Sequence, residues 1–333
     1  MVTVKIVTMP EDGERLIHQA IAELGWGADP EAVAKLVKRL ERGLPAEDEF
    51  SVICSWLGKC QLLHKLDQQQ VPATSRQIFQ VPDLLARFTT QVNDRPVLIE
   101  VKSKNERVLS FRPDYLDRLS NYATLVGMPL LIAWKFQGVW TLFEAKHLKK
   151  ARTNFNISLQ EALRQNLLGA LVGDVAYNIG KGAGVHFRIR KKKLLSISEV
   201  DGEHVENWEM MMEEVKITDF NGNQRTDLTG EVKSLFFAWD LEARQEHVEP
   251  DIWVHFVAEN EGMQFAHMAL VRLLQWESSN EARPDWRSLL VKKQVTRSIA
   301  DFSAVLEKAM EQHVVYYIFR VRPHEMPVFL SEP

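Results

Sequence analysis

Cysteine is scarce in this chain, which has only two among its 333 residues. Cys54 and Cys60 stand six apart in a segment that reads as helix, so they face different sides and offer neither a disulfide framework nor a CxxC zinc site. Long apolar runs are also missing, since no stretch reaches the roughly 18 residues that a membrane helix needs. The N-terminus lacks the basic, apolar and small-residue order of a signal peptide. We therefore expect a cytoplasmic protein with no membrane partner and two ordinary thiols.

Acidic residues are in small excess over basic residues, which gives a net charge of -4, but two segments are each strongly biased towards one sign of charge. Residues 146–193 hold 11 Lys and Arg against 2 acidic residues, and residues 199–261 hold 17 acidic against 4 basic residues. The basic stretch could neutralise phosphates, whereas the acidic stretch would repel them. The alternative is that both are solvated faces that partly pair with each other.

Apolar periodicity predicts an α/β core with a mixed central sheet flanked by helices, followed by a second, α+β domain. We expect domains at residues 1–195 and 196–333, because the chain is long enough for two cores. The helices expected in the first domain are residues 11–24, 29–42, 46–66, 114–126 and 158–171. Its expected strands are 77–90, 96–103, 129–135, 139–143 and 185–190. In the second domain we expect strands at 235–239, 252–257 and 314–320 and helices at 264–276 and 298–313.

The most informative motif is Pro82-Asp83 followed, seventeen residues after Asp83, by Glu100-Val101-Lys102 at the end of an apolar strand. Side chains alternate across a strand, so Glu100 and Lys102 must share one face. In a hairpin, a loop centred near residues 91 and 92 places Asp83 opposite Glu100. A tight turn at residues 93 and 94 would instead separate the carboxylates by roughly 13 Å. We predict the longer loop, or a bulge that closes the gap.

Two carboxylates on one face form an oxygen-ligand site for a hard cation such as Mg²⁺ or Mn²⁺. Such a cation lowers the pKa of its bound water, and it shields the negative charge of the phosphodiester that otherwise repels the attacking nucleophile. Lys102 could position or activate the attacking water and stabilise the charge of the transition state. The predicted chemistry is phosphodiester hydrolysis.

These residues match the bipartite motif of the PD-(D/E)xK, or restriction-endonuclease-like, nuclease superfamily. The helix and strand that follow, from Tyr115 to Trp134, resemble those of archaeal Holliday-junction resolvases and related restriction endonucleases. The resemblance implies Asp83, Glu100 and Lys102 as catalytic residues, with Asp83, Glu100 and Val101 as metal ligands.

Relatives also carry an acidic residue on a preceding helix, for which Glu49 is the candidate, because Ile53 and Leu57 follow at helical spacing, and Glu47 is the rival. Many relatives carry a Gln on the helix after the motif. This chain has Arg118, Asn121 and Tyr122 in that region.

Two other features need separate interpretation. The tetrapeptide Glu231-Val-Lys233-Ser repeats that of Glu100 to Ser103, but it follows a polar segment and has no upstream Pro-Asp, so it is rejected as a site. A basic strand could follow a nucleic-acid backbone, or could be an ordinary charged edge strand. Its residues are Arg188, Arg190, Lys191, Lys192 and Lys193.

The sequence thus predicts a metal-dependent endonuclease whose substrate is DNA by the resemblance, with RNA left open. One alternative is a nucleic-acid-binding protein that keeps the nuclease fold without hydrolysis. Another is a nuclease gated by a signal bound at the C-terminal domain, for which partner binding, substrate selection and homodimerisation are all expected uses. Restriction, phage defence, junction resolution and transposon-end cleavage stay open as pathways.

Overall fold

The computed structural model describes residues 20, 37, 45–67, 70–90, 95–200, 203–259, 262–277, 286–290 and 301–331. The chain forms two compact units. Unit 1 comprises Met1–Ser55, Cys60–Leu171 and Pro323–Pro333, and unit 2 comprises Trp56–Lys59 and Val172–Arg322. A boundary at residue 195 falls inside strand β10 (Gly184–Val200), whose pairing with its neighbours keeps it within unit 2. The helices expected at 11–24 and 29–42 lie outside the described residues, apart from residues 20 and 37.

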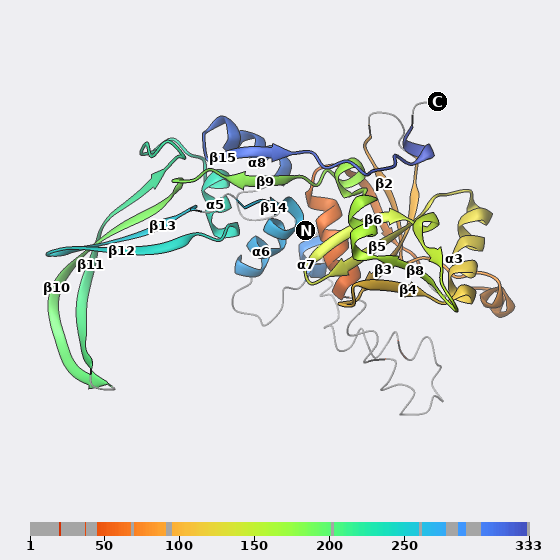
Figure 1. The fold of residues 1–333 in the computed structure, drawn as a ribbon, viewed down its shortest axis with the longest axis horizontal. Helices are drawn as coiled ribbons and strands as arrows, with labels where there is room; N and C mark the ends of the chain where they lie inside the picture. The colour runs from red at the N-terminus through yellow and green to blue at the C-terminus, as the bar shows by residue number, and fades with distance from the viewer. Residues whose placement is uncertain are drawn as a thin grey trace, which may run out of the picture. The chain divides into compact units, whose positions relative to one another are not determined.

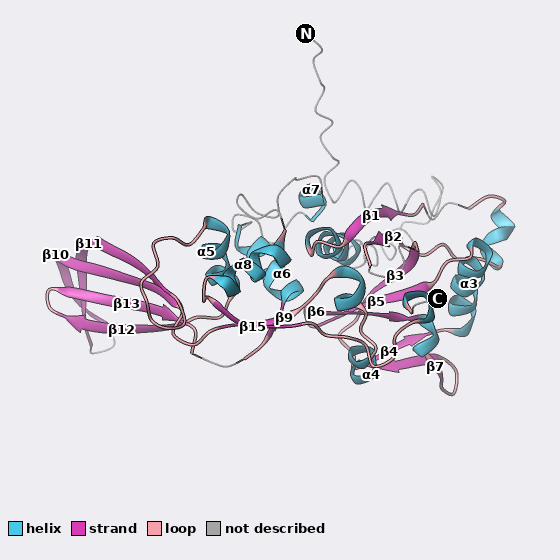
Figure 2. Cartoon of the chain, turned by 90° about the horizontal axis from the view of Figure 1, so that it is seen from above, coloured by secondary structure: helices cyan, strands magenta, loops and turns pink. Residues whose placement is uncertain are grey.

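Unit 1 is built on a five-stranded mixed sheet, which confirms the predicted fold class (Figure 1). Its strands are β1 (Cys60–Lys65), β2 (Leu84–Phe88), β3 (Val97–Ser103), β5 (Leu130–Phe136) and β6 (Val139–Glu144). Figure 2 shows the order β1-β2-β3-β5-β6. Only β3 and β5 are parallel, because a helical crossover joins them.

Both faces of this sheet are covered. On one face, Ile132, Trp134 and Phe143 form a core with helix α3 (Pro113–Val126) and a small three-stranded sheet. That small sheet consists of β4 (Val108–Phe111), β8 (Phe155–Ser158) and β7 (Lys149–Lys150). On the other face lies the helix of residues 45–56, where Phe50 contacts Trp140 with ring centroids 4.9 Å apart. The shorter helical elements of unit 1 are Ala73–Gln77, Ala145–His147, α4 (Leu159–Arg164), Leu168–Val172 and Val328–Leu330.

Local sequence signals set the ends of several elements as predicted. Helix α3 ends at Gly127, which adopts the left-handed conformation with a φ of 68°. The turn between β5 and β6 consists of Gln137 and Gly138, whose φ angles of 46° and 87° suit a two-residue hairpin. The strand, turn and helix that follow the Glu100 motif are therefore confirmed.

Several predicted helix and strand boundaries in unit 1 were wrong. The helix expected to reach residue 66 ends at residue 56, because Gly58 takes a φ of 94° and the chain turns into β1. Residues 77–83 are not part of a strand, and β2 begins only at Leu84. The helix expected at 158–171 ends early, at Arg164. Ser158 caps its N-terminus by accepting a hydrogen bond from the Glu161 backbone N–H. Cys54 and Cys60 are both free thiols, and burial raises the pKa of Cys60 to about 11.

Unit 2 contains a four-stranded antiparallel sheet in the order β11-β10-β13-β12 and a three-stranded sheet in the order β14-β9-β15. The strands of the first are β10, β11 (Glu203–Thr218), β12 (Glu242–Val248) and β13 (Asp251–Val257). Those of the second are β9 (Ala176–Ile179), β14 (Gln264–Phe265) and β15 (Val315–Phe319). Its helices are α5 (Gly230–Ala238), α6 (Ala266–Glu277), α7 (Trp286–Leu290) and α8 (Phe302–Glu311).

The second unit departs from expectation in two places. The apolar run at 235–239, predicted to be a strand, belongs mostly to helix α5, in which Val232, Leu235 and Phe236 are buried. The prediction failed because the periodicity of so short an apolar run does not distinguish a strand from a helix. The strand expected at 185–190 extends to Val200. No helix among the described residues is long and apolar enough to cross a membrane.

Candidate active site

Strand pairing places Asp83 directly opposite Glu100. The register pairs Leu84 with Ile99 and Leu85 with Leu98, so its continuation by one residue brings Asp83 to Glu100. The longer loop was therefore the correct prediction. The backbone N–H of Val101 donates a hydrogen bond to Asp83 Oδ2 over 2.7 Å, which fixes this carboxylate against the motif strand.

Glu100 and Lys102 share the face of the sheet that α3 covers. In the parallel pair, Glu100 lies beside Ile132 and Lys102 beside Trp134. The Lys102 ammonium contacts Glu100 Oε1, and its Nζ lies 5.3 Å from the ring centroid of Tyr115. The Tyr115 hydroxyl donates a hydrogen bond to the same Oε1 over 2.5 Å. Tyr115 is thus a site residue whose role the sequence did not reveal, because it comes from α3 rather than from the motif.

The electrostatics of the cluster are dominated by burial and by two neighbouring carboxylates. Burial, followed by the negative charge of Glu100, raises the pKa of Asp83 well above its usual value, and Lys102 opposes the shift. Burial alone would lower the pKa of Lys102, but Glu100, Tyr115 and Asp83 together raise it. Burial and the Glu100 carboxylate raise the pKa of Tyr115 as well. The site therefore favours added positive charge.

One oxygen of the site fits a bound cation. Glu100 Oε2 is buried and accepts no hydrogen bond within the described part of the chain, while Oε1 is held by Lys102 and Tyr115. No three His, Cys, Asp or Glu side chains surround a common point among the described residues. A cation here would therefore rely on Asp83, on Glu100 Oε2 and on the carbonyl oxygen of Val101, with water or phosphate oxygens completing its shell.

The structure does not bring Glu49 to this cluster. Its carboxylate lies on the opposite face of the sheet, where Oε1 accepts a hydrogen bond from Trp140 Nε1 over 2.9 Å and Oε2 contacts Lys135 Nζ at 2.5 Å. Glu47, the rival candidate, does not join Asp83 and Glu100 in a three-carboxylate cluster among the described residues, although burial and, less strongly, the negative charge of Glu100 raise its pKa. Lys65, 3.4 Å away, lowers the pKa of Glu47. Helical spacing predicted that Glu49 lies in line with Ile53 and Leu57, and Ile53 is buried, but that face of the helix covers the core rather than the motif.

The helix α3 also holds the segment that leads to Asp83. Arg118 Nη1 donates to the carbonyl oxygen of Arg76 over 2.9 Å, and Asn121 Nδ2 donates to that of Ile78 over 3.1 Å. In return, the Gln80 backbone N–H donates to the Arg118 carbonyl oxygen over 3.1 Å. Arg118 and Asn121 thus fix the backbone ahead of Asp83.

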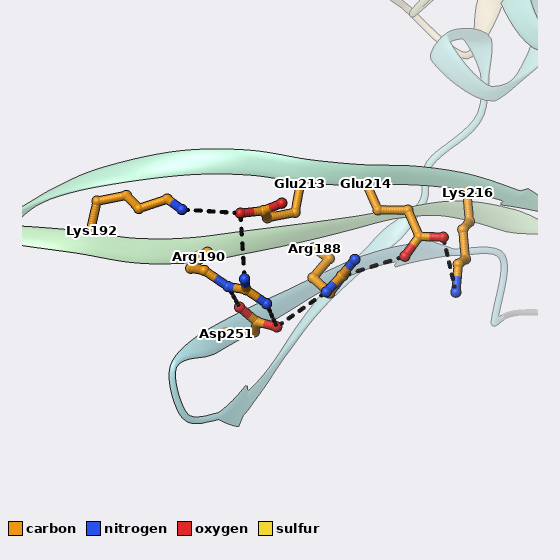
Figure 3. Close-up of polar contacts among 7 residues, drawn as sticks. All are labelled: Arg188, Arg190, Lys192, Glu213, Glu214, Lys216 and Asp251. Carbon is orange, nitrogen blue, oxygen red and sulfur yellow. Dashed lines mark hydrogen bonds and ion pairs between the residues drawn. The ribbon is translucent and has the colours of Figure 1, made fainter.

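The basic strand lies in unit 2, and most of its charges are compensated there (Figure 3). Arg190 Nε contacts Asp251 Oδ1 at 2.7 Å, and Arg188 contacts Asp251 and Glu214. Lys192 lies 3.3 Å from Glu213, and Lys191 lies 2.8 Å from Glu249. This pairing supports the interpretation that the basic and acidic segments pair with each other, over phosphate contacts. The expectation of an edge strand was wrong for Arg188 and Arg190, because β10 lies there between β11 and β13.

The repeated tetrapeptide has no comparable surroundings. Glu231 stands in the first turn of α5, and its Oε2 accepts a hydrogen bond from Lys308 Nζ over 3.1 Å. On a helix, Glu231 and Lys233 do not face the same side, because residues two apart diverge. Its rejection as a site agrees with this geometry.

A match to a known protein family supports the interpretation of unit 1. Residues 71–172 match the family model described as archaeal Holliday junction resolvase (hjc). A 1.6 Å structure of Archaeoglobus fulgidus Hjc, a Holliday junction resolvase from an archaeal hyperthermophile, is 22% identical over 37% of this chain and 88% of that chain, with a TM-score of 0.27. No curated protein matches the chain. The family match spans Asp83, Glu100 and Lys102 together with α3, which confirms the resemblance that the motif predicted.

Proposed function

We propose that this chain is a metal-dependent endonuclease that hydrolyses phosphodiester bonds in DNA, with Asp83, Glu100 and Lys102 as its catalytic residues. The observation that carries the proposal is the convergence of these three side chains, through the β2–β3 register, inside the segment that matches a resolvase family. A four-way junction is the first substrate to test, because that family is described by its action on such junctions.

Each residue of the site would have a separate role in hydrolysis. Asp83 and Glu100 Oε2, with the Val101 carbonyl, would hold Mg²⁺ or Mn²⁺. The ion would supply an activated water and shield the phosphate charge. Lys102 and Tyr115 hold Glu100 Oε1 and leave Oε2 for the ion. The Lys102 ammonium stands beside the carboxylates, where it can attract the phosphate and stabilise the charge that develops during hydrolysis.

Cleavage assays with a matched control test this proposal. The wild type and the Lys102→Ala variant are incubated with supercoiled, linear and four-way-junction DNA and with RNA, in Mg²⁺, Mn²⁺ or EDTA. Lys233→Ala is the control, since Lys233 occupies the same place in the repeated tetrapeptide on α5. We expect metal-dependent cleavage that is retained in Lys233→Ala and abolished in Lys102→Ala, Asp83→Ala and Glu100→Ala.

The outcomes separate the competing functions. Unchanged cleavage by any of the purified site variants removes that residue from the mechanism. Salt-sensitive DNA binding by the wild type without a metal-dependent product favours the non-catalytic protein. A change in activity on adding a ligand that binds unit 2 favours the gated nuclease.

A further inference from the structure

The basic segment of residues 146–193 is neutralised in only part of its length. Six of its 11 Lys and Arg residues form ion pairs with described acidic residues: Lys146, Arg164, Arg188, Arg190, Lys191 and Lys192. Among the other five, which have no ion-pair partner in the described part of the chain, three stand together in unit 1 as Lys149, Lys150 and Arg152. The charge of Lys149 acts on the carboxylate of Glu161, which is already paired with Arg164. All three side chains are exposed, so they remain available to an anion.

The three cations lie on the basic hairpin, which we define as residues 149–158 and which comprises β7, a turn and β8. The Ala151 backbone N–H donates to the Asn154 carbonyl oxygen over 2.7 Å, so the chain turns through residues 152 and 153. Residues 107–112, which contain the neighbouring strand β4, hold two basic residues, and the basic hairpin holds three. Neither stretch contains an acidic residue. Such a surface attracts a polyanion.

The basic hairpin is held to β4 and to the core of unit 1, so its cations stand on an ordered support. Ser110 Oγ donates to Asn156 Oδ1 over 2.6 Å and accepts a hydrogen bond from Asn154 Nδ2 over 3.1 Å. Phe155 packs against the buried core cluster that contains Trp134. A support that is already ordered reduces the entropy that binding would cost.

Strand register brings the basic hairpin to the candidate active site. Lys150 pairs with Phe155, which pairs in turn with Phe111 of β4. The ring centroid of Phe111 lies 5.9 Å from Lys102 Nζ and 6.1 Å from the ring centroid of Tyr115. Two strand spacings of about 4.8 Å separate Lys150 from Phe111, so the Lys150 backbone lies within about 20 Å of the Lys102 ammonium. On a duplex that rises ~3.4 Å per base pair, this span covers about six base pairs.

We propose that the basic hairpin binds the phosphate backbone of the duplex arm next to the bond that the active site cuts, through Lys149, Lys150 and Arg152. The inference rests on the proposed endonuclease function, because that function supplies the substrate. Contacts to phosphates carry no sequence information, so the hairpin positions the arm and does not select its sequence. The ion-paired cations of β10 take no part in this contact.

The salt dependence of junction binding tests the contact. Binding of a fluorescent four-way junction to the full-length protein is measured by anisotropy in EDTA, from about 50 to 200 mM salt. Each lost phosphate contact lowers the slope of log K against log salt by about 0.9, so Lys149→Ala/Lys150→Ala/Arg152→Ala should lower it by about 2.7. Lys149→Arg/Lys150→Arg/Arg152→Lys keeps the three charges and should keep the slope.

Lys191→Ala/Lys192→Ala/Lys193→Ala is the matched control, because it removes as many cations from the same basic segment, two of them ion-paired in unit 2. Its slope should equal that of the wild type, and circular dichroism checks that both triple variants fold. The proposal is overturned by an unchanged slope in the hairpin variant, by an equal loss in the control, or by a wild type whose binding is not salt-sensitive.

Neutral replacements in the DNA locate the contact. Methylphosphonates within about six base pairs of the cut bond should weaken wild-type binding at least about tenfold and leave binding by the hairpin variant unchanged. The same replacements about 12 base pairs away should affect neither protein. Equal weakening of both proteins by the near replacements would place the contact elsewhere and refute the proposal.

Cleavage in Mg²⁺ separates failure of this inference from failure of the proposed function. A wild type that cuts DNA, together with a hairpin variant whose slope is unchanged, refutes the hairpin contact and leaves the nuclease. A wild type that shows the expected difference in slope but cuts nothing refutes the nuclease and retains the contact with the phosphate backbone.

Discussion

The hydroxyl of Tyr115 donates a hydrogen bond to Glu100 Oε1, and this contact joins helix α3 to the motif strand. Lys102 contacts the same oxygen, so Oε1 is held from two sides while Oε2 is buried without a hydrogen bond from the described residues. The tyrosine therefore acts on the orientation of a carboxylate that would bind the metal, although it belongs to a different element.

Removing only this hydroxyl should weaken metal binding. Tyr115→Phe keeps the ring that faces Lys102, but it loses a hydrogen bond to a charged group, worth about 1.5 kcal/mol or roughly tenfold in affinity. We expect about tenfold weaker Mn²⁺ binding by calorimetry and a matching rise in the metal concentration needed for cleavage.

Tyr122→Phe, on the same helix, is the control and should leave both values unchanged. Equal metal affinity in wild type and Tyr115→Phe would show that the hydroxyl does not position Glu100.

Glu47 and Glu49 should respond oppositely to the same substitution. Glu49→Gln keeps an acceptor for Trp140 but removes the charge that faces the partly exposed Lys135. The free energy of unfolding, measured in urea, should therefore fall by about 1–2 kcal/mol. Cleavage by the folded Glu49→Gln protein should be unaffected, because this carboxylate lies on the other face of the sheet. Glu47→Gln should instead reduce cleavage and Mn²⁺ affinity without loss of stability. A Glu49→Gln protein that folds normally but has lost cleavage would refute this assignment.

A hydrogen-bonded chain in the four-stranded sheet predicts a pH dependence of stability. The Thr218 hydroxyl donates to the Gly182 carbonyl oxygen over 3.0 Å, so His186 Nε2 must be the donor to Thr218 Oγ1, 2.9 Å away. His186 Nδ1, 2.7 Å from Nδ1 of His255, is then the acceptor, which requires His186 to be neutral.

Burial lowers the pKa of His186, and the neighbouring His255 and Lys216 lower it further. Because the unfolded chain binds this proton more readily, stability contributed here is present above pH 6.5 and declines as the pH falls below it. Each kcal/mol lost lowers Tm by about 2–4 °C in a unit of this size. Calorimetry from pH 7.5 to 5.5 should show a smaller decline in His186→Gln than in wild type. Parallel declines would exclude this chain as a pH-sensitive element.

The sequence by itself determined the core of the candidate site. Alternation along residues 97–103 put Glu100 and Lys102 on one face, and parity with the neighbouring strand put Asp83 on that same face, while the pairing of β2 with β3 decided that Asp83 comes level with Glu100. Gly127 and the Gln137-Gly138 turn marked the ends of α3 and β5. These features are local or repeat with a short period, so backbone geometry alone fixes them.

Tertiary structure decided which groups from other elements reach the site. Helical spacing puts Glu47 and Glu49 on different sides of their helix, but only the packing of that helix decides which side meets Trp140. Tyr115 is distant from Glu100 in sequence, and nothing local links a helix hydroxyl to a strand carboxylate. The sequence likewise does not decide what the charges of the basic segment contact. In the folded chain β10 lies between β11 and β13, and Asp251 and Glu213 compensate charges of the segment. Non-local packing and charge pairing depend on contacts that no short sequence pattern encodes.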